Sequence, residues 1–422
     1  GITVTAVNDA PVNTVPVAQS TNEDTNKVIT GLSITDVDAG SSTMTVTLGM
    51  TNGTLTLLSG AGVTITGNNS TSVTLSGTVT NINALLATAN AVTYVPTANY
   101  NGSATLTMTT NDGTLSDADT VTVTVTSVND APTGTNATIT LAEDGSKTFA
   151  ASDFGFADAA DSPANSLSAV IITTLPTAGT LTLSGTAVTL NQSIAVANLG
   201  SLVYSPAQNA NGNAYATIGF KVQDNGGTAN GGADTSVNAN TLTFNVTGVN
   251  DAPVVNTATA LSLAGVSEDA GVPSGSSAGT AVSELFAAIT DADVGHTKSV
   301  AITGVNSNGK LYFSADGGSS WQEVTTTLSE SNALHLDGNS RVYFRPNANW
   351  NGTLSDAIQF RAWDQTSMAI IGSTSAVGTT GGSGAYSTAV ASVGITVTAV
   401  NDAPVNTVPD ASITTAARDA AD

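Results

Sequence analysis

The stretch ITVTAVNDAP at residues 2–11 decides how this chain is organised, because its last five residues return at long, regular intervals. VNDAP occurs four times, and its successive aspartates are 121, 121 and 151 residues apart. Recurrence of one motif at a fixed distance is typical of chains built from tandem structural repeats. The four aspartates are Asp9, Asp130, Asp251 and Asp402.

This spacing predicts three complete domains, which we name repeat 1 (residues 12–132), repeat 2 (133–253) and repeat 3 (254–404). Repeat 3 carries an insertion of about 30 residues, as expected where related repeats keep a common core and differ in their loops. We interpret residues 1–11 as the end of a preceding domain with its linker, and residues 405–422 as the truncated start of a following domain.

Both ends of the chain contain the same sixteen residues, since GITVTAVNDAPVNTVP occupies positions 1–16 and again positions 394–409. The first copy has neither the basic region nor the apolar region of a signal peptide. We therefore expect the chain to be a window from a longer array, and we expect residues 410–422 to be poorly ordered.

Outside the motif, threonine and valine alternate, as in VTVTVTSV at residues 121–128. A period of two residues predicts strands with one buried and one solvated face. Turns rich in Asn-Gly, Asp-Gly and Gly-Gly separate these short runs, and about seven strands per repeat suit a Greek-key sandwich. The predicted fold class is all-β, with three tandem Greek-key, Ig-like β-sandwich modules in an elongated array and one helical turn near Asn81–Ala87.

The charge balance excludes several classes of partner. Nine Lys and Arg stand against 32 Asp and Glu, for a net charge of −23. Binding to nucleic acid needs clustered basic residues, and anionic membrane surfaces are excluded for the same reason. No run of 18 apolar residues is present, so we expect no transmembrane helix. The absence of cysteine excludes disulfides and thiolate metal sites.

The acids recur in the same order in each repeat, which a merely solvated acidic surface would not require. An acidic pair comes first, then an Asp-rich loop, then the motif P-x-x-N-x-N-G, then a later aspartate. In chain order these landmarks are Glu23-Asp24, Glu143-Asp144 and Glu268-Asp269; Asp36 with Asp38, Asp158 with Asp161, and Asp291 with Asp293; the motifs that start at Pro96, Pro206 and Pro346; and Asp112, Asp224 and Asp364.

This order predicts metal sites at the linkers. Loops that are distant in sequence gather at the two poles of a sandwich, and carboxylates facing each other across a short linker repel unless a cation neutralises them. Calcium takes six to eight oxygen ligands from carboxylates, amides and carbonyls, whereas magnesium prefers a strict octahedron with retained water. Two histidines and no cysteine argue against zinc or copper.

The order of Glu, N-x-N, Asn-Asp-x-Pro linker, DxD and later Asp resembles that of cadherin repeats. The VNDAP boundary, with NED, AED or SED after it, is more similar to the cadherin-like modules of giant bacterial adhesins of the RTX and VCBS type. The resemblance covers all three repeats, and it implies Ca²⁺ as the cofactor and an extracellular, cell-surface location.

The resemblance also implies which residues bind calcium. For the linker between repeats 1 and 2 it implies Glu23, Asn99, Asn101, Asn129, Asp130, Asp158, Asp161 and Asp224. For the linker between repeats 2 and 3 it implies Glu143, Asn209, Asn211, Asn250, Asp251, Asp291, Asp293 and Asp364. For the first linker it implies Asn8, Asp9, Asp36, Asp38 and Asp112, and for the last linker Glu268, Asn401 and Asp402.

Two departures from the cadherin pattern reduce the number of carboxylates. Asparagine stands in P-x-x-N-x-N-G where eukaryotic cadherins have acidic residues, and repeat 2 has D-x-x-D, at Asp158 and Asp161, in place of DxD. We therefore expect fewer or weaker ions at each linker.

Catalysis has little support in this sequence. We find no G-x-S-x-G, HExxH or phosphate-binding glycine loop. His296 is interpreted as a surface turn residue, and GTTGGSG at residues 378–384 as a flexible loop of the insertion. The segment from Ser314 to Trp321 matches the Asp-box S-x-D-x-G-x-x-W, which we interpret as a structural hairpin.

All three tryptophans lie in repeat 3, at Trp321, Trp350 and Trp363. Buried aromatic residues would enlarge the core of this repeat, and exposed ones could stack on a sugar ring or a partner protein. We favour the core interpretation and keep the other as an alternative.

The sequence thus predicts a non-enzymatic structural extender of a large bacterial adhesin, stiffened by calcium at its linkers, that supports cell adhesion or biofilm formation. Its expected partners are calcium ions and the neighbouring modules of the same chain. The alternative is a module that binds surface glycans or proteins through the repeat 3 aromatics, or one that self-assembles into a filament or sheath through edge strands.

Overall fold

The structure is a computed structural model that describes residues 1–5 and 7–405. The chain divides into two compact units, Gly1–Thr247 and Gly248–Asp422. Apart from residue 405, the expected start of a following domain lies outside the described residues, and so does the expected disorder of residues 410–422.

Repeat 1 forms two main layers of strands. The larger sheet has the order β2-β11-β10-β5-β8-β7, a three-stranded sheet has the order β3-β9-β6, and β1 pairs with β4. The pairing of β2 with β11 is parallel. The strands of repeat 1 are β1 (Val12–Thr14), β2 (Gln19–Asn22), β3 (Lys27–Ile29), β4 (Ser33–Thr35), β5 (Met44–Met50), β6 (Gly53–Leu57), β7 (Val63–Thr66), β8 (Ser72–Gly77), β9 (Val92–Pro96), β10 (Gly102–Asn111) and β11 (Ser116–Thr126).

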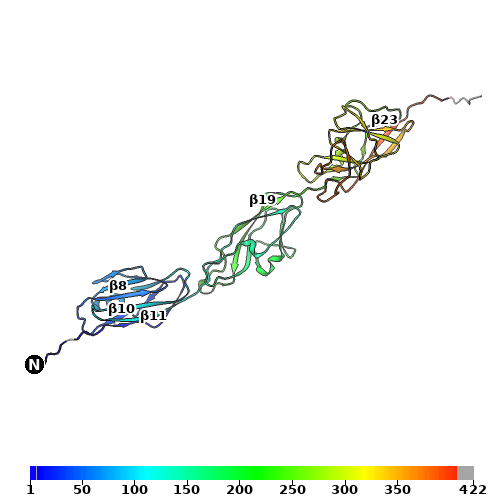
Figure 1. Ribbon diagram of the computed structural model, residues 1–422. Coiled ribbons are helices and arrows are strands. Elements are labelled where there is room, and N and C mark those ends of the chain that lie inside the picture. The colour runs from blue at the N-terminus through cyan, green and yellow to red at the C-terminus, as the bar shows by residue number, and fades with distance from the viewer. Residues whose placement is uncertain (6, 406–422) are drawn as a thin grey trace, which may run out of the picture. The chain divides into compact units, whose positions relative to one another are not determined.

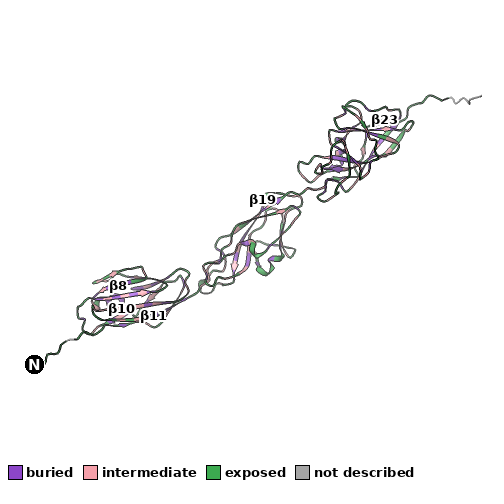
Figure 2. Cartoon of the chain, viewed as in Figure 1, coloured by how far each residue is buried: buried purple, intermediate pink, exposed green. Residues whose placement is uncertain are grey.

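Figure 1 draws the strands as arrows, and Figure 2 colours the same view by burial. The alternation in the sequence explains how these strands pack. In β5, MTVTLGM, every second residue is buried and the threonines are half-exposed. The expected helical turn is confirmed as α1 (Val79–Leu86), whose first turn is capped by the Thr78 hydroxyl accepting from the Asn81 N–H. A side-chain hydroxyl oxygen that accepts from a free backbone N–H is the usual way to satisfy the start of a helix.

Repeat 2 is a second sandwich with its own core. Its sheets have the orders β12-β20-β19-β14-β17 and β13-β18-β15-β16. The core is rich in aromatic rings, with Tyr204 stacked on Phe244 at 4.0 Å between ring centres. Its elements are β12 (Ala137–Ala142), β13 (Lys147–Thr148), the 3₁₀ helix η1 (Ala151–Phe154), β14 (Leu167–Thr174), β15 (Thr180–Leu183), β16 (Thr186–Ala187), β17 (Ser193–Ala195), η2 (Val196–Ser201), β18 (Leu202–Ser205), β19 (Gly212–Asp224), η3 (Ala229–Gly231) and β20 (Asn240–Thr247).

Repeat 3 has the same two layers with additions. One sheet has the order β22-β33-β31-β26-β29-β32 with β23 also on β33, the other has the order β24-β30-β27-β28, and β21 pairs with β25. Its elements are β21 (Val254–Val255), β22 (Leu261–Ser262), β23 (Val266–Ser267), β24 (Thr280–Ala281), η4 (Val282–Ala288), β25 (Ile289–Thr290), β26 (Ser299–Val305), β27 (Gly309–Ser314), β28 (Gln322–Glu323), β29 (Ala333–Leu336), β30 (Arg341–Pro346), β31 (Gly352–Trp363), β32 (Thr374–Ser375) and β33 (Ala391–Thr398).

The insertion of repeat 3 forms a small second core. Trp363 and Tyr386 pack there with three alanines, and the fully buried His335 donates to or accepts from the Tyr386 hydroxyl at 2.9 Å. Burial lowers the pKa of His335. The insertion therefore adds packed structure to the sandwich and is not only a loop.

The predicted all-β sandwich fold is confirmed, but the strands are more broken than expected. Within the described part of repeat 1 there are eleven strands, against about seven expected. One cause is Pro16, which separates β1 from β2, because proline lacks the N–H that a ladder requires. The division into three domains stays a prediction, although the unit Gly1–Thr247 holds two separate hydrophobic cores.

Separate cores lead to a first prediction. Leu48 is fully buried at the centre of β5, so Leu48→Ala should destabilise repeat 1 by about 2–5 kcal/mol through lost burial and a cavity. Hydrogen exchange should show the loss over residues 12–126 while residues 137–247 keep their protection. Thr45→Ala, on the half-exposed face of the same strand, is the control. Equal loss in both repeats would show that the two cores unfold as one.

Candidate metal sites

Each described VNDAP segment before a repeat is joined to that repeat by its asparagine. The Asn side chain donates a hydrogen bond to the later aspartate of the repeat that follows. The donor and acceptor atoms lie 2.7 Å apart for Asn8 and Asp112, 3.1 Å for Asn129 and Asp224, and 2.9 Å for Asn250 and Asp364.

The aspartate of the motif makes a second recurring contact, through its backbone. Its N–H donates to the second acid of the Asp-rich loop. We call this bond and the bond of the asparagine side chain the linker hydrogen bonds. The N–H of Asp9 donates to Asp38 at 3.2 Å, that of Asp130 to Asp161 at 3.2 Å, and that of Asp251 to Asp293 at 2.7 Å. Asp161 thus takes the place of the second DxD acid, and the loop of repeat 2 absorbs its extra residue.

The first acid of the Asp-rich loop uses only one oxygen in hydrogen bonds. Asp36 Oδ1 accepts from the N–H groups of Asp38 and Ala39, and Asp158 Oδ2 accepts from that of Asn165 at 2.6 Å. The other oxygens, Asp36 Oδ2 and Asp158 Oδ1, are buried and have no hydrogen-bond partner. Asp130 Oδ2 is also buried without a hydrogen-bond partner. A buried oxygen without a partner is costly, and a bound cation would satisfy it.

The electrostatics of the segment between repeats 1 and 2 also fit a cation. Burial raises the pKa of Asp130, and the charges of Asp24, Glu23 and Asp158 raise it further. Burial likewise raises the pKa of Asp161 and of Asp224, with Asp158 adding its charge to both. The fold therefore disfavours these negative charges as they stand, which is the condition that a divalent cation reverses.

Asp112, which accepts from Asn8 of the first linker, has the opposite environment. Hydrogen bonds from the Leu115 N–H, the Asn8 side chain and the Thr114 N–H lower the pKa of Asp112 to about 2. Its charge is already stabilised by donors, so it is well placed to hold the linker whether or not a cation binds.

The glutamate of each acidic pair lies at the opposite pole and is buried. Glu23 accepts from the Val128 N–H, and Glu268 accepts from the Val400 N–H at 2.6 Å and from Asn351 at 2.7 Å. These donors lower the pKa of Glu268, with the Val400 N–H as the main cause. Glu268 therefore has a structural role in holding the start of the outgoing linker.

The N-x-N loops have a structural explanation too. Their first asparagines, Asn99, Asn209 and Asn349, have φ of 56°, 54° and 59°, a left-handed conformation that asparagine tolerates better than most residues. The Asn99 N–H donates to Asp24 at 3.1 Å. Asn101 donates to the Ser162 carbonyl at 2.9 Å, which joins repeat 1 to repeat 2.

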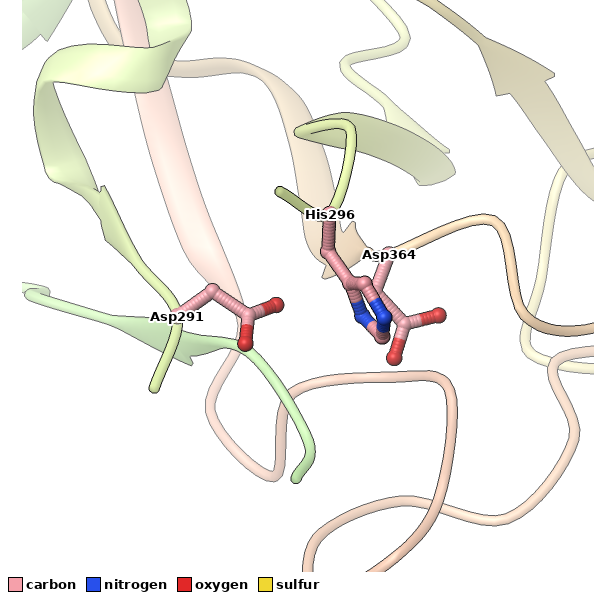
Figure 3. Close-up of side chains that lie close together, drawn as sticks. All are labelled: Asp291, His296 and Asp364. Carbon is pink, nitrogen blue, oxygen red and sulfur yellow. The ribbon is translucent and has the colours of Figure 1, made fainter. Parts of the chain in front are cut away.

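Three side chains of repeat 3 lie close enough to share one ion. Asp291, His296 and Asp364 each offer a ligand atom, and these atoms lie within 4.8 Å of one another (Figure 3). Over residues 1–5 and 7–247, no three Asp, Glu or His side chains meet this condition.

At the far end of the described chain, the predicted ligands Asn401 and Asp402 are exposed. The hydrogen bond shown for them joins the Asn401 amide to the Asp402 carbonyl at 3.4 Å. The structure does not bring this pair together with an acidic loop within the described residues.

The sequence analysis missed residues that hold the linkers. Asn165 contacts both Asn129 and Asp161, and a loop of repeat 2 returns to the linker, where Asn129 and Ala233 exchange hydrogen bonds. In repeat 3 the Gly384 carbonyl accepts from Asn250 at 3.1 Å. No sequence signal identifies these contacts, because they depend on where a loop returns.

The glycine-rich segment 378–384, which was expected to be a flexible loop, contacts the linker. The Ala252 N–H donates to the Gly382 carbonyl at 2.7 Å, so the segment is bound to the linker. Glycine leaves its carbonyl unobstructed and lets the backbone approach closely.

The Asp-box prediction of a structural hairpin is confirmed. β27 pairs with β28 around it, and Asp316 accepts from the Ser314 and Ser320 hydroxyls, both at 2.6 Å. These hydroxyl donors lower the pKa of Asp316 to about 2. Its carboxylate is occupied by the turn itself.

Comparisons with known proteins show similarity at the level of solved structures. No protein-family model and no curated protein matches the chain. Cadherin domains 1–5 of protocadherin gamma B2 are 14% identical, with a TM-score of 0.44, over 93% of this chain and 61% of that one. Mouse protocadherin-24 EC1-3 is 15% identical, with a TM-score of 0.38, over 82% and 91%.

An endo-fucoidan hydrolase of glycoside hydrolase family 107 is 15% identical, with a TM-score of 0.20, over 92% of this chain and 44% of that one. All three TM-scores are below 0.5, so the fold assignment rests on the strand pairing above. Among the described residues, no helix is both long and apolar enough to cross a membrane.

The raised pKa values give a second prediction. Because folding raises the pKa of Asp130, its contribution to stability is present below the ordinary carboxyl value and is lost as pH rises through the folded value. In chelator, the exchange protection factor of the Val128 N–H should therefore fall as the pH rises above the ordinary carboxyl pKa. Asp130→Asn should flatten this dependence, and Asp119→Asn should leave it unchanged. An identical pH dependence of Val128 protection in both variants would contradict the role given to Asp130.

Proposed function

We propose that this chain is a structural segment of a large extracellular bacterial adhesin or surface protein, in which calcium ions stiffen the VNDAP linkers. The observation that carries the proposal is the set of buried, unpartnered carboxylate oxygens at one linker, Asp130 Oδ2 and Asp158 Oδ1. The linker hydrogen bonds place Asp161 and Asp224 at the same linker.

Calcium fits this donor set better than other common cations. The side chains offer carboxylate and amide oxygens, and calcium accepts six to eight such ligands in flexible geometry. The proposed core of the site between repeats 1 and 2 consists of four acids, Asp130, Asp158, Asp161 and Asp224. Carbonyl oxygens and water are proposed to complete the coordination. Glu23 and Glu268 are proposed to position the linker, since their oxygens accept from linker N–H groups.

The proposed mechanism is electrostatic. Without a cation, the mutual repulsion of Asp130, Asp158 and the acidic pair Glu23-Asp24 opposes a single linker geometry. With a cation, oxygens from both sides of the linker are drawn to one centre, and the freedom of the linker is reduced. Extracellular calcium modules bind at about 10⁻⁴–10⁻³ M, so the external medium would set the stiffness.

The other linkers are proposed to act in the same way, by equivalence of their residues in sequence. The bacterial origin, the cell-surface location and a role in adhesion or biofilm formation belong to this proposal and rest on the VNDAP resemblance. They are consistent with the net charge of −23, which suits a solvated segment that binds cations.

The alternative, a glycan-binding surface made of repeat 3 aromatics, loses its main support. Trp363 and Phe344 are buried, and Trp350 packs against the core. The Trp321 Nε1–H donates to the Gly275 carbonyl at 3.3 Å, so its polar atom is bound to a loop of the same repeat. The core interpretation of these rings is the one that the packing supports.

The test is a calcium titration of a variant. Replacing Asp158 and Asp161 together by Asn should remove the calcium-dependent stabilisation of the unit Gly1–Thr247, about 1–3 kcal/mol at saturating calcium. It should also remove any calcium-dependent increase of the maximum dimension in small-angle scattering. Asp119→Asn, which removes a charge from β11, is the control. A melting temperature and a scattering profile of the unmodified chain that ignore calcium would refute the proposed function.

A further inference from the structure

His296 distinguishes repeat 3 from the other two. In repeat 3 it stands three residues after the second loop acid, Asp293, and in repeat 1 the same position is Ser41, three residues after Asp38. Repeat 2 has Ala164 at this distance from Asp161. One acidic loop of three thus carries a nitrogen ligand.

The geometry brings this nitrogen to the acids. Figure 3 shows the imidazole of His296 between the carboxylates of Asp291 and Asp364, and the three ligand atoms lie within 4.8 Å of one another. Asp293 is also near, with its Oδ2 at 3.6 Å from His296 Nδ1. His296 thus lies close to acids that come from two different loops.

The carboxylate of Asp364 is held in place for this arrangement. Asp364 is 3% exposed, and it accepts from the Thr366 N–H at 2.7 Å, the Thr366 hydroxyl at 2.6 Å and Asn250 at 2.9 Å. Ligands whose outer oxygens accept such bonds are oriented before an ion binds.

A second feature of this cluster favours a bound cation. The carbonyl oxygen of the same Asn250 amide, Oδ1, is buried with no hydrogen-bond partner. Burial raises the pKa of Asp291, and the charges of Asp293 and Asp364 raise it further. The cluster therefore holds an unsatisfied acceptor beside acids that repel one another.

The simpler interpretation is that His296 is only an ion partner of Asp293. That interpretation accounts for the 3.6 Å contact, but it requires a protonated imidazole and leaves the Asn250 oxygen without a partner. Imidazole nitrogen is a ligand for zinc, copper, nickel and cobalt, whereas calcium takes oxygen. The donor set of Asp291, His296 and Asp364 is thus chemically different from the all-oxygen sets of repeats 1 and 2.

We propose that Asp291, His296 and Asp364 form a mixed nitrogen–oxygen site that takes a borderline transition-metal cation, Zn²⁺ or Co²⁺. The inference rests on the proposed function in one respect, since Asp291 and Asp364 belong to the proposed calcium set. A tetrahedral zinc site needs ligand atoms roughly 3.4 Å apart, from bonds near 2.0–2.1 Å. His296 is exposed, so its ring is free to make this adjustment, and water would fill the remaining positions.

The experiment uses the full chain and two matched variants. His296→Ser gives repeat 3 the residue of repeat 1, and Ser41→His gives repeat 1 the residue of repeat 3. Both positions are exposed, so both variants should fold, which circular dichroism verifies. Zinc binding is measured by calorimetry, the visible spectrum of added Co²⁺ reports nitrogen ligation, and calcium-dependent melting is measured in parallel.

We expect the unmodified chain to bind Zn²⁺ at least tenfold more tightly than His296→Ser, with the Co²⁺ band weakened in that variant. Ser41→His should gain affinity, and calcium-dependent melting should stay unchanged in both variants. Equal zinc affinity of the unmodified chain and His296→Ser would overturn this inference and leave the calcium proposal standing. His296-dependent zinc binding without any calcium effect would support this inference and refute the calcium proposal.

Discussion

The linker hydrogen bonds are the constraint on which the rest of this structure depends. An asparagine side chain and an aspartate N–H, adjacent in the chain, each bond to an acid of the following repeat. A peptide held at two adjacent points by two different loops has little freedom to rotate. The same pair of bonds occurs at three linkers with similar lengths, so each linker enters its repeat in one defined way.

This constraint explains why carboxylates are buried in a protein with so few bases. Nine Lys and Arg are too few to neutralise 32 acids, and the linker acids are paired with amides and N–H groups and not with Lys or Arg. Such donors stabilise some oxygens, as at Asp112, and leave others unpartnered, as at Asp158. Buried acids without counter-ions destabilise the folded state. A cation that binds them would stabilise the folded state by an amount that depends on the cation concentration.

The loop that follows the later aspartate and contacts the linker differs in length between the repeats. Repeat 1 has a tight hairpin after Asp112, in which that aspartate accepts from Thr114 and Leu115. Repeats 2 and 3 have longer loops there, and these return to the linker through Ala233 and through Gly382 and Gly384. Repeat 3 also buries His335, Trp363 and Tyr386 in a second small cluster, so the aromatics that the sequence concentrates there serve mainly to pack it.

The sequence by itself determined the period of the repeats, the all-β class and the identity of the acids, because alternation and motif spacing are local patterns. It also identified the helical turn and the Asp-box hairpin, whose caps and turns are made within a few residues. Only the tertiary structure decided which oxygens are already occupied, as in Glu268, and which are buried without a partner, as in Asp158. It alone brought His296 to Asp291 and Asp364, since a contact between loops that lie 68 residues apart depends on how two strands of one sheet are paired, and no local pattern encodes that pairing.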